Sequence, residues 1–249
     1  MAYVRFLHDR KDSVPVVGGH RGHRSDVREN TVENFRQLQD LGLAYIEIDV
    51  QMTADEEIVI FHDQELSHTT SLRGRVCACS LAELRRSFSI NTVEEVLRWA
   101  CQIGMGIGFE LKLYPGESRH YRETLVRKLA QLIAQYEFYQ DCFVFGKDPD
   151  TLRYLRGLDQ KVNLAVIAPG LFEQALELMR ELDAFMYLDF LSGLDPQKVR
   201  RLHEAGYLVD GSVVDTYQEL NRARALQVDM IESNEPAYIL SLLSGDDFR

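Results

Sequence analysis

The chain has 249 residues and a formal net charge of −11 at neutral pH, and 45% of its residues are hydrophobic. This length is typical of a single domain, and we expect one domain over residues 1–249. The acidic balance argues against nucleic acid or an anionic membrane as the main partner, because either would favour a basic surface.

The sequence shows no targeting segment and no disulfide framework. Its start, MAYVRFLHDRKDS, is charged where a signal peptide needs an apolar segment, and no apolar run approaches the roughly 20 residues that span a bilayer. The four cysteines (Cys77, Cys79, Cys101 and Cys142) lack the paired spacing of a zinc site and are too few for a disulfide framework. We therefore expect reduced thiols, no transmembrane segment and a cytoplasmic protein.

Short apolar runs rich in β-branched residues alternate with helical patterns along the chain. Apolar residues recur every three or four positions in the helical patterns, and Asn30, Asn91, Asp148 and Asp195 are expected N-caps. The predicted strands are VPVVG from residue 14, YIEIDV at 45–50, IVIFH at 58–62, MGIGFELKL at 105–113, CFVFG at 142–146, NLAVIA at 163–168, AFMYLDF at 184–190, GYLVDGSVV at 206–214 and DMIES at 229–233.

This repeated order of strand and helix predicts an α/β fold with a parallel sheet. If IVIFH pairs as an extra strand directly after YIEIDV, eight strands remain, which is the number that closes a TIM (β/α)₈ barrel. An open doubly wound sheet has the same local pattern, but no glycine-rich phosphate loop follows the first strand. We predict a single-domain TIM barrel with a short helical insertion, residues 63–104, after the second strand region.

Charged residues lie where several predicted strands end, which is where such a barrel builds its active site. Glu47 and Asp49 are two positions apart in one strand, and Glu110 and Lys112 are two apart in another. Residues two apart on a strand point to the same face, so each pair projects together into the barrel mouth. The structural alternative is that these carboxylates form ion pairs with Arg or Lys partners.

The three carboxylates predict a divalent cation. Oxygen ligands without convergent cysteines favour a hard ion, Mg²⁺ or Ca²⁺, over zinc, and Glu47, Asp49 and Glu110 are the expected ligands. His20 and His62 each end a strand, and imidazoles beside such an ion suit general acid and base catalysis. A histidine at a strand end can also be a purely structural group, and this alternative stays open.

Two basic residues complete the predicted site. Arg21 and Lys112 are expected to bind a phosphate, the first through its planar fork and the second as a point charge. Together these residues indicate a metal-dependent phosphodiesterase that acts on a small molecule. They do not identify the alcohols on either side of the phosphorus.

Several segments of the chain match the motifs of one known family. They are HRG at 20–22, ENT at 29–31, EIDVQMTADEEIVIFHD at 47–63, LSHTT at 66–70, NTVEEVL at 91–97 and FELK at 109–112, with weaker matches in LVDGSVVDT at 208–216 and VDMIESNEP at 228–236. In these segments the chain resembles the glycerophosphodiester phosphodiesterase family. The resemblance implies a TIM barrel that hydrolyses glycerophosphodiesters to glycerol 3-phosphate and an alcohol with a divalent cation.

Position by position, the resemblance implies the same roles for the same residues. His20 and His62 match the acid and base pair, and the insertion at 63–104 matches a segment that covers the site. The metal ligands and phosphate-binding groups match in the same way: Glu47, Asp49 and Glu110 for the metal, and Arg21 and Lys112 for the phosphate. His23 and Arg24 are expected to be rim residues.

The chain departs from the family pattern at four positions that bear on the substrate. Ser212 replaces a common Trp, Gly146 a Ser, Asn234 an acidic residue and Arg28 a common Pro. Two other functions therefore remain open: a related barrel enzyme of phospholipase D type that acts on lysophospholipid or sphingolipid headgroups, and a catalytically silent barrel that binds phosphorylated metabolites. The sequence does not predict the oligomeric state.

Overall fold

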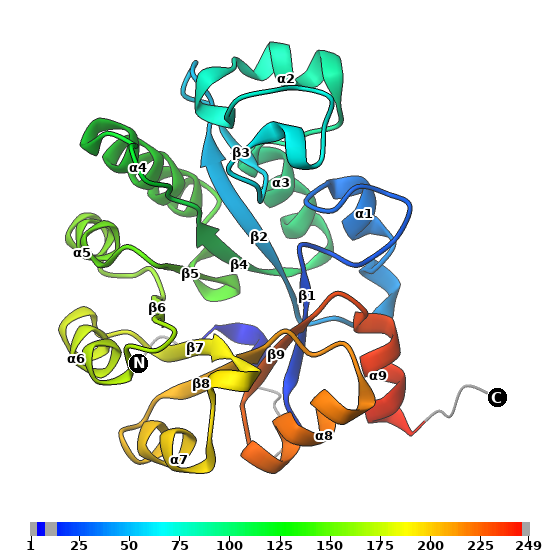
Figure 1. Cartoon of the computed structure of the whole chain (residues 1–249), viewed down its shortest axis with the longest axis vertical. Coiled ribbons are helices and arrows are strands. Elements are labelled where there is room, and N and C mark those ends of the chain that lie inside the picture. The colour runs from blue at the N-terminus through cyan, green and yellow to red at the C-terminus, as the bar shows by residue number, and fades with distance from the viewer. Residues whose placement is uncertain (1–3, 8–13, 246–249) are drawn as a thin grey trace.

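Eight parallel strands form the centre of the computed structural model, which describes residues 4–7 and 14–245 (Figure 1). Hydrogen-bonded neighbours follow the order β5, β4, β2, β1, β9, β8, β7, β6, and a bridge from Val144 to Leu164 brings the two ends together. The predicted TIM barrel is therefore confirmed, and it is nearly closed. Its strands are β1 (Val16–His20), β2 (Tyr45–Met52), β4 (Gly106–Leu111), β5 (Cys142–Gly146), β6 (Ala165–Ile167), β7 (Met186–Phe190), β8 (Leu208–Ser212) and β9 (Met230–Ser233).

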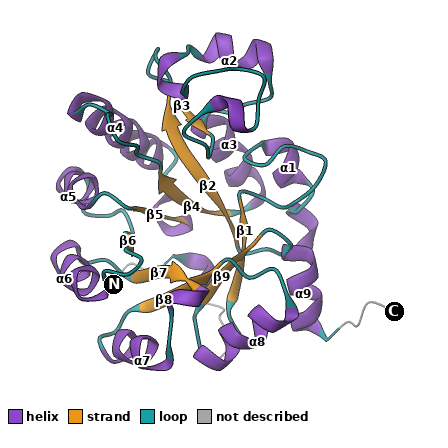
Figure 2. Cartoon of the chain, viewed as in Figure 1, coloured by secondary structure: helices purple, strands orange, loops and turns teal. Residues whose placement is uncertain are grey.

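Each parallel strand is followed by a helix of the outer ring (Figure 2). Asp148 and Asp195 are the N-cap residues of α5 and α7, as predicted. The cysteines are free, also as predicted. No described helix is long and apolar enough to cross a membrane. The ring consists of α1 (Val32–Arg36), α3 (Val93–Ile103), α4 (Arg119–Gln135), α5 (Pro149–Leu158), α6 (Phe172–Leu182), α7 (Pro196–Glu204), α8 (Tyr217–Leu226) and α9 (Pro236–Ser244).

The predicted caps Asn30 and Asn91 are wrong by one residue. Thr31 caps α1 and Thr92 caps α3, each with its side chain accepting a backbone N–H of the first turn. The two asparagine side chains have other partners: Asn30 binds Asp49 in the barrel, and Asn91 accepts the amide that starts α1. Tertiary contacts thus decide which of two adjacent capping residues is used.

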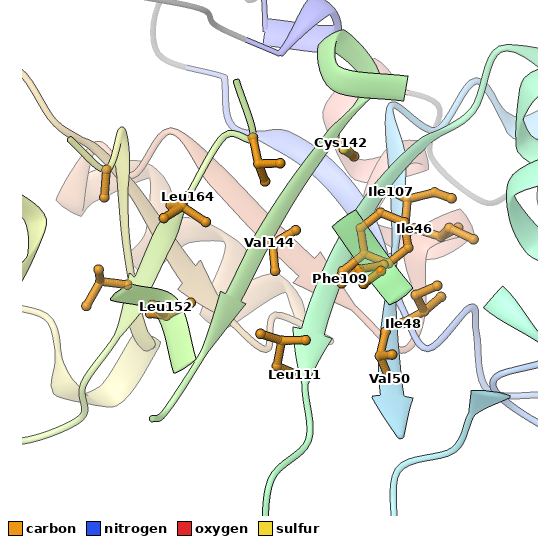
Figure 3. Close-up of a cluster of buried hydrophobic side chains, with 14 of the residues drawn as sticks. Ile46, Ile48, Val50, Ile107, Phe109, Leu111, Cys142, Val144, Leu152 and Leu164 are labelled. Carbon is orange, nitrogen blue, oxygen red and sulfur yellow. The ribbon is translucent and has the colours of Figure 1, made fainter. Parts of the chain in front are cut away.

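The outer face of the strands is apolar and packs against the helices. On β2 this face consists of Ile46, Ile48 and Val50, all buried (Figure 3). Burial of one such side chain contributes about 1.5–3 kcal/mol, so the outer layer fixes the register of the strand. Because side chains alternate along a strand, Glu47 and Asp49 must point into the barrel.

Aromatic rings fill the barrel near the amino-terminal ends of its strands. The Tyr45 ring lies with its centroid 5.6 Å from that of Phe143, and Phe6 of the short helix η1 (Arg5–Leu7) stacks on Tyr45 at 5.1 Å. Gly18 leaves space for this packing, because a Cβ there would lie 2.3 Å from the Tyr45 ring. The charged residues of the interior therefore lie above an apolar floor.

The short strand β3 (Ile58–Ile60) pairs antiparallel with β2, as predicted. It is followed by the inserted segment that contains α2 (Leu81–Ser87). In Figure 1, α2 lies beyond the tip of β2. Within residues 63–104, α3 packs in the main core of the barrel, so the segment before α3 is the part that departs from the repeat. Together with β3 and Phe61, that segment forms a small core of its own, made by Val59, Phe61, Leu66, Val76, Leu84 and Ile90.

Candidate active site

The chain turns sharply after His20, the last residue of β1. Arg21 has a φ of 56° and Gly22 a φ of 97°. A Cβ at Gly22 would lie 2.1 Å from Asn34 Oδ1, so only glycine fits there. The turn also aims the Arg21 amide at Glu47, where it donates to the backbone oxygen and to Oε2, each at 3.1 Å.

The three predicted metal ligands converge at the carboxyl ends of β2 and β4. Asp49 is the register partner of Glu110, and Glu47 precedes Asp49 on the same face. One carboxylate oxygen from each of Glu47, Asp49 and Glu110 lies within 4.8 Å of the others. The three residues are 1%, 0% and 9% exposed, so their charges are held away from bulk water.

Two cationic side chains contact these carboxylates. Lys112 Nζ lies 3.0 Å from Asp49 Oδ1 and 2.7 Å from Glu110 Oε2, and Arg21 Nε lies 3.3 Å from Asp49 Oδ2. Burial opposes ionisation of Asp49, but the charges of Lys112 and Arg21 outweigh it and lower its pKa. Burial opposes the charged form of Lys112, but the carboxylates of Asp49, Glu110 and Glu47 outweigh it and raise the pKa of Lys112. Asp49 and Lys112 are therefore both charged at neutral pH.

Glu47 is a carboxylate whose negative charge is not offset by the neighbouring positive charges. Burial, together with Asp49 and Glu110, raises its pKa well above the usual range. Its Oε1 is buried and has no hydrogen-bond partner among the residues that the structure describes. An unpaired buried oxygen in an all-oxygen cluster is what a hard divalent cation would bind, so the residues present fit such an ion.

Each of the two predicted histidines has its Nδ1 in a hydrogen bond. His20 Nδ1 lies 2.8 Å from Asn234 Oδ1, and His62 Nδ1 lies 2.8 Å from Asp63 Oδ1. The backbone oxygen of His62 also accepts a hydrogen bond from the Tyr114 hydroxyl. Burial lowers the pKa of His20, with a further contribution from Arg21, which favours the neutral ring.

His20 and His62 line one cavity of about 390 Å³, which is also lined by Arg24, Arg28 and Asn234. His62 lines a second cavity of about 490 Å³ together with Glu110 and Lys112. His62 thus lies between two hollows of the mouth. The predicted rim residue His23 binds Gln37 through Nε2, and Arg24 binds Glu235.

Sequence reasoning missed three residues of this site. Asn30 donates to Asp49 Oδ2 at 2.7 Å, although it was interpreted as a helix cap. Asp210 and Glu232 are buried acids on β8 and β9, and Glu232 offers a carboxylate oxygen within 4.8 Å of ligand atoms of His20 and Glu47. Both acids interrupt apolar runs, which is the signal that identified the acids of β2.

The sequence matches a known family over most of its length. The model of the glycerophosphoryl diester phosphodiesterase family matches residues 20–238. The chain belongs to this family. A glycerophosphodiester phosphodiesterase of Caldanaerobacter subterraneus subsp. tengcongensis is 24% identical over 244 residues, which cover 92% of this chain and 97% of that protein.

Solved structures of similar proteins share the fold. A phosphodiesterase of Oleispira antarctica, in complex with the product sn-glycerol-3-phosphate, is 24% identical with a TM-score of 0.83, covering 94% of this chain and 100% of that one. A glycerophosphodiester phosphodiesterase of Parabacteroides distasonis is 19% identical with a TM-score of 0.82, covering 94% and 98%.

The positions at which the chain departs from the family pattern have defined surroundings. The Ser212 hydroxyl donates to Asp210 and accepts the Glu232 amide at 2.8 Å, so this side chain is part of the β8–β9 network. Gly146 lines a separate cavity of about 460 Å³ near α5 and α6. Asn234 contacts His20 directly.

Proposed function

We propose that the chain is a metal-dependent phosphodiesterase that hydrolyses glycerophosphodiesters to glycerol 3-phosphate and an alcohol. The observation that carries this proposal is that three carboxylates, two histidines and two cationic side chains converge at one mouth of the barrel. Membership of the family supports the reaction, and the product bound to the Oleispira antarctica relative supports the substrate class.

In this proposal Glu47, Asp49 and Glu110 hold the cation, Mg²⁺ or Ca²⁺. When bound, such an ion polarises a phosphoryl oxygen and stabilises the charge that develops on it. Arg21 and Lys112 bind the remaining phosphoryl oxygens. Their charges are already in place, because both side chains contact Asp49.

His20 and His62 transfer the protons. With Nδ1 of each ring in a hydrogen bond, Nε2 is the nitrogen left for the substrate. One ring removes the proton of the nucleophile, which is water or the neighbouring glycerol hydroxyl. Attack by the hydroxyl forms a cyclic phosphate, which water then opens to glycerol 3-phosphate. The other ring protonates the departing alkoxide, so the alcohol leaves as a neutral molecule.

The part of the insertion that precedes α3, residues 63–92, acts as a small lid in this proposal. Arg28, in the loop after β1, donates to the Thr69 backbone oxygen at 3.1 Å and to its Oγ1 at 3.2 Å. The same guanidinium lies 4.5 Å from the ring centre of Phe88 and 5.2 Å from that of Phe61. Thr69 and Arg28 both line the cavity that contains the two histidines.

The decisive experiment assays the purified protein against glycerophosphodiesters, with and without a chelator. We expect glycerol 3-phosphate release that stops on chelation and returns with Mg²⁺ or Ca²⁺. His20→Ala and His62→Ala should each lower kcat about 10²–10⁴-fold. His120→Ala, on the exposed face of α4, is the control. Undiminished turnover in either site variant would refute the assigned roles.

A second candidate function, hydrolysis of lysophospholipid headgroups, is favoured by two exposed apolar side chains. Leu171, between β6 and α6, is 55% exposed, and Phe190, at the carboxyl end of β7, is 52% exposed. Such groups suit contact with an acyl chain. A higher kcat/KM for lysophosphatidylcholine than for glycerophosphocholine, reduced in Phe190→Ser, would select this substrate. The cytoplasmic location stays a prediction.

A further inference from the structure

His20 can accept a proton through Nε2 only if its other ring nitrogen carries the hydrogen. Neutral imidazole has two tautomers, and the partner of one nitrogen decides which tautomer forms. The partner of His20 Nδ1 is the side-chain oxygen of Asn234, at 2.8 Å. An oxygen accepts, so Nδ1 must donate, and Nε2 keeps the lone pair.

The Asn234 side chain does not by itself determine the tautomer of His20. Rotating its amide by half a turn would present the NH₂ group to His20 and force the opposite tautomer. What decides the orientation is Asp215, whose Oδ2 lies 2.8 Å from Asn234 Nδ2. A carboxylate has no hydrogen to donate, so the NH₂ group must face Asp215 and the oxygen must face His20.

Asp215 is itself held firmly, at the start of the segment that leads into α8. Its Oδ1 accepts the Asn234 amide at 2.7 Å and the Ser233 hydroxyl at 3.1 Å. Its own amide donates to Glu219 Oε2 at 2.9 Å, in the capping box of α8. The orientation of the His20 partner is thus linked to the start of a helix.

We propose that Asp215 is a positioning residue that acts through Asn234 to fix His20 in its Nδ1–H tautomer. This inference rests on the proposed function, in which His20 transfers a proton. Asp215 also accepts bonds from the end of β9, so loss of its charge can act by changing the tautomer or by loosening this loop. The two effects are separable.

Asp215→Asn tests the tautomer directly. If the new carboxamide oxygen keeps the Ser233 and Asn234 amide bonds, its NH₂ group meets the NH₂ group of Asn234. Asn234 then turns and donates to His20 Nδ1, leaving the proton on Nε2. We expect kcat to fall about 10²–10³-fold with little change in KM, as for loss of a general acid or base.

The double variant Asp215→Asn/Asn234→Asp provides the rescue. A carboxylate at position 234 accepts from His20 Nδ1 and from the new NH₂ group at position 215, so the Nδ1–H tautomer returns. We expect kcat within about tenfold of the unmodified enzyme. If Asp215 only held the loop, the second substitution would restore nothing. Asp195→Asn, which removes a carboxylate from the N-cap of α7, is the matched control.

The tautomer is measured independently of turnover. Long-range ¹H–¹⁵N spectra of ¹⁵N-histidine protein at about pH 8 with Mg²⁺ show which ring nitrogen is protonated, and His20→Ala assigns the signal. We expect Nδ1–H in the unmodified protein and in the double variant, and Nε2–H in Asp215→Asn. An Nε2–H ring in the unmodified protein would overturn the inference. Absence of diesterase activity would refute the proposed function, but it would not contradict the inference that Asp215 fixes the tautomer of His20.

Discussion

Asp49 is the residue on which the contacts of the site converge. Its two carboxylate oxygens meet Lys112 Nζ, Arg21 Nε and Asn30 Nδ2 within 2.7–3.3 Å. At 0% exposure, Asp49 is ionised only because these groups surround it. Removing the charge of one partner in a buried ion pair leaves the other uncompensated.

Asp49→Asn should therefore affect both stability and turnover. We expect a loss of about 3–5 kcal/mol in the free energy of unfolding, because Lys112 and Arg21 are left without their shared partner. Turnover should fall at least about 10³-fold, since the same change removes a cation ligand. Urea unfolding and steady-state rates measure the two effects. Asp40→Asn, exposed in the short 3₁₀ helix η2 (Gln39–Leu41) before β2, is the control, and equal stability of the two variants would contradict this account.

The pKa of Asp210 is shifted in the opposite direction from that of Asp49. Burial raises its pKa to about 6, even though the hydroxyls of Ser212 and Tyr45 donate to it. Because the folded-state pKa lies above the ordinary value of 3.8, the folded protein binds this proton more tightly than the unfolded chain does. The stability that this tighter proton binding contributes is complete below about pH 4 and is lost as the pH rises through about 6.

Asp210→Asn should consequently change how stability depends on pH. The amide cannot ionise, so the variant gains about 1–3 kcal/mol relative to the unmodified protein between pH 5 and pH 8. Urea unfolding with chelator present, at both pH values, gives this difference. A difference between the two proteins that is the same at pH 5 and pH 8 would show that Asp210 does not titrate in this range.

The loop after β1 and the lid behave as coupled elements through Arg28. Its guanidinium makes two hydrogen bonds to Thr69 and lies over the rings of Phe61 and Phe88. We expect Arg28→Ala to raise KM about 3–10-fold and to speed proteolysis within residues 63–80, because contacts worth about 1–3 kcal/mol are lost. Limited proteolysis and initial rates test this.

The choice of variants at position 28 separates charge from shape. Arg28→Lys keeps the charge but lacks the planar fork that reaches both Thr69 and the rings, so it should resemble Arg28→Ala. Arg98→Ala, on the exposed face of α3, should behave as the unmodified protein. A lysine variant with normal KM and normal protease resistance would mean that charge alone matters here.

The elements of the barrel were predictable because their signals are local. Alternation in YIEIDV placed Ile46 and Ile48 outside and Glu47 and Asp49 inside, and the structure has this arrangement. The use of Asn30 depends instead on contact with a residue 19 positions away, and periodicity carries no such information.

The partner of His20 could not be predicted from local sequence either. Asn234 reaches His20 across 214 positions, because β9 pairs with β1 only when the barrel closes. The acids of β8 and β9 did carry a local signal, since they interrupt apolar runs, but no motif of matching strength drew attention to them. Strand order and alternation were therefore readable from the sequence, whereas the contacts that orient the site were not.

At the scale of the whole molecule, the barrel mouth concentrates negative charge in an already acidic protein. Buried carboxylates at Glu47, Asp49, Glu110, Asp210 and Glu232 have only Arg21 and Lys112 as cationic contacts in the described part of the chain. Burial keeps the pKa of Glu47 and Glu232 well above the usual range, so protons substitute for positive charge when no ion is bound. A divalent cation would release such protons and link the strands that supply its ligands.

Binding of the ion should therefore stabilise the entire fold. At a concentration about 100 times its Kd, a ligand of the folded state adds about 2.7 kcal/mol. For a chain of this size that corresponds to a rise in Tm of about 5–10 °C. Thermal unfolding with chelator and with Mg²⁺ or Ca²⁺ measures the shift without any substrate.

Glu47→Gln separates this specific binding from a general effect of salt. The variant keeps the shape of the side chain and loses the carboxylate whose Oε1 has no partner among the described residues, so the cation-dependent rise in Tm should largely disappear. Glu204→Gln, exposed at the end of α7, should keep the full rise. If Glu47→Gln kept it too, the ion would bind elsewhere. Because burial disfavours the ionised form of Glu47 and the amide of the variant cannot ionise, the variant without ion should also be at least as stable as the unmodified protein without ion.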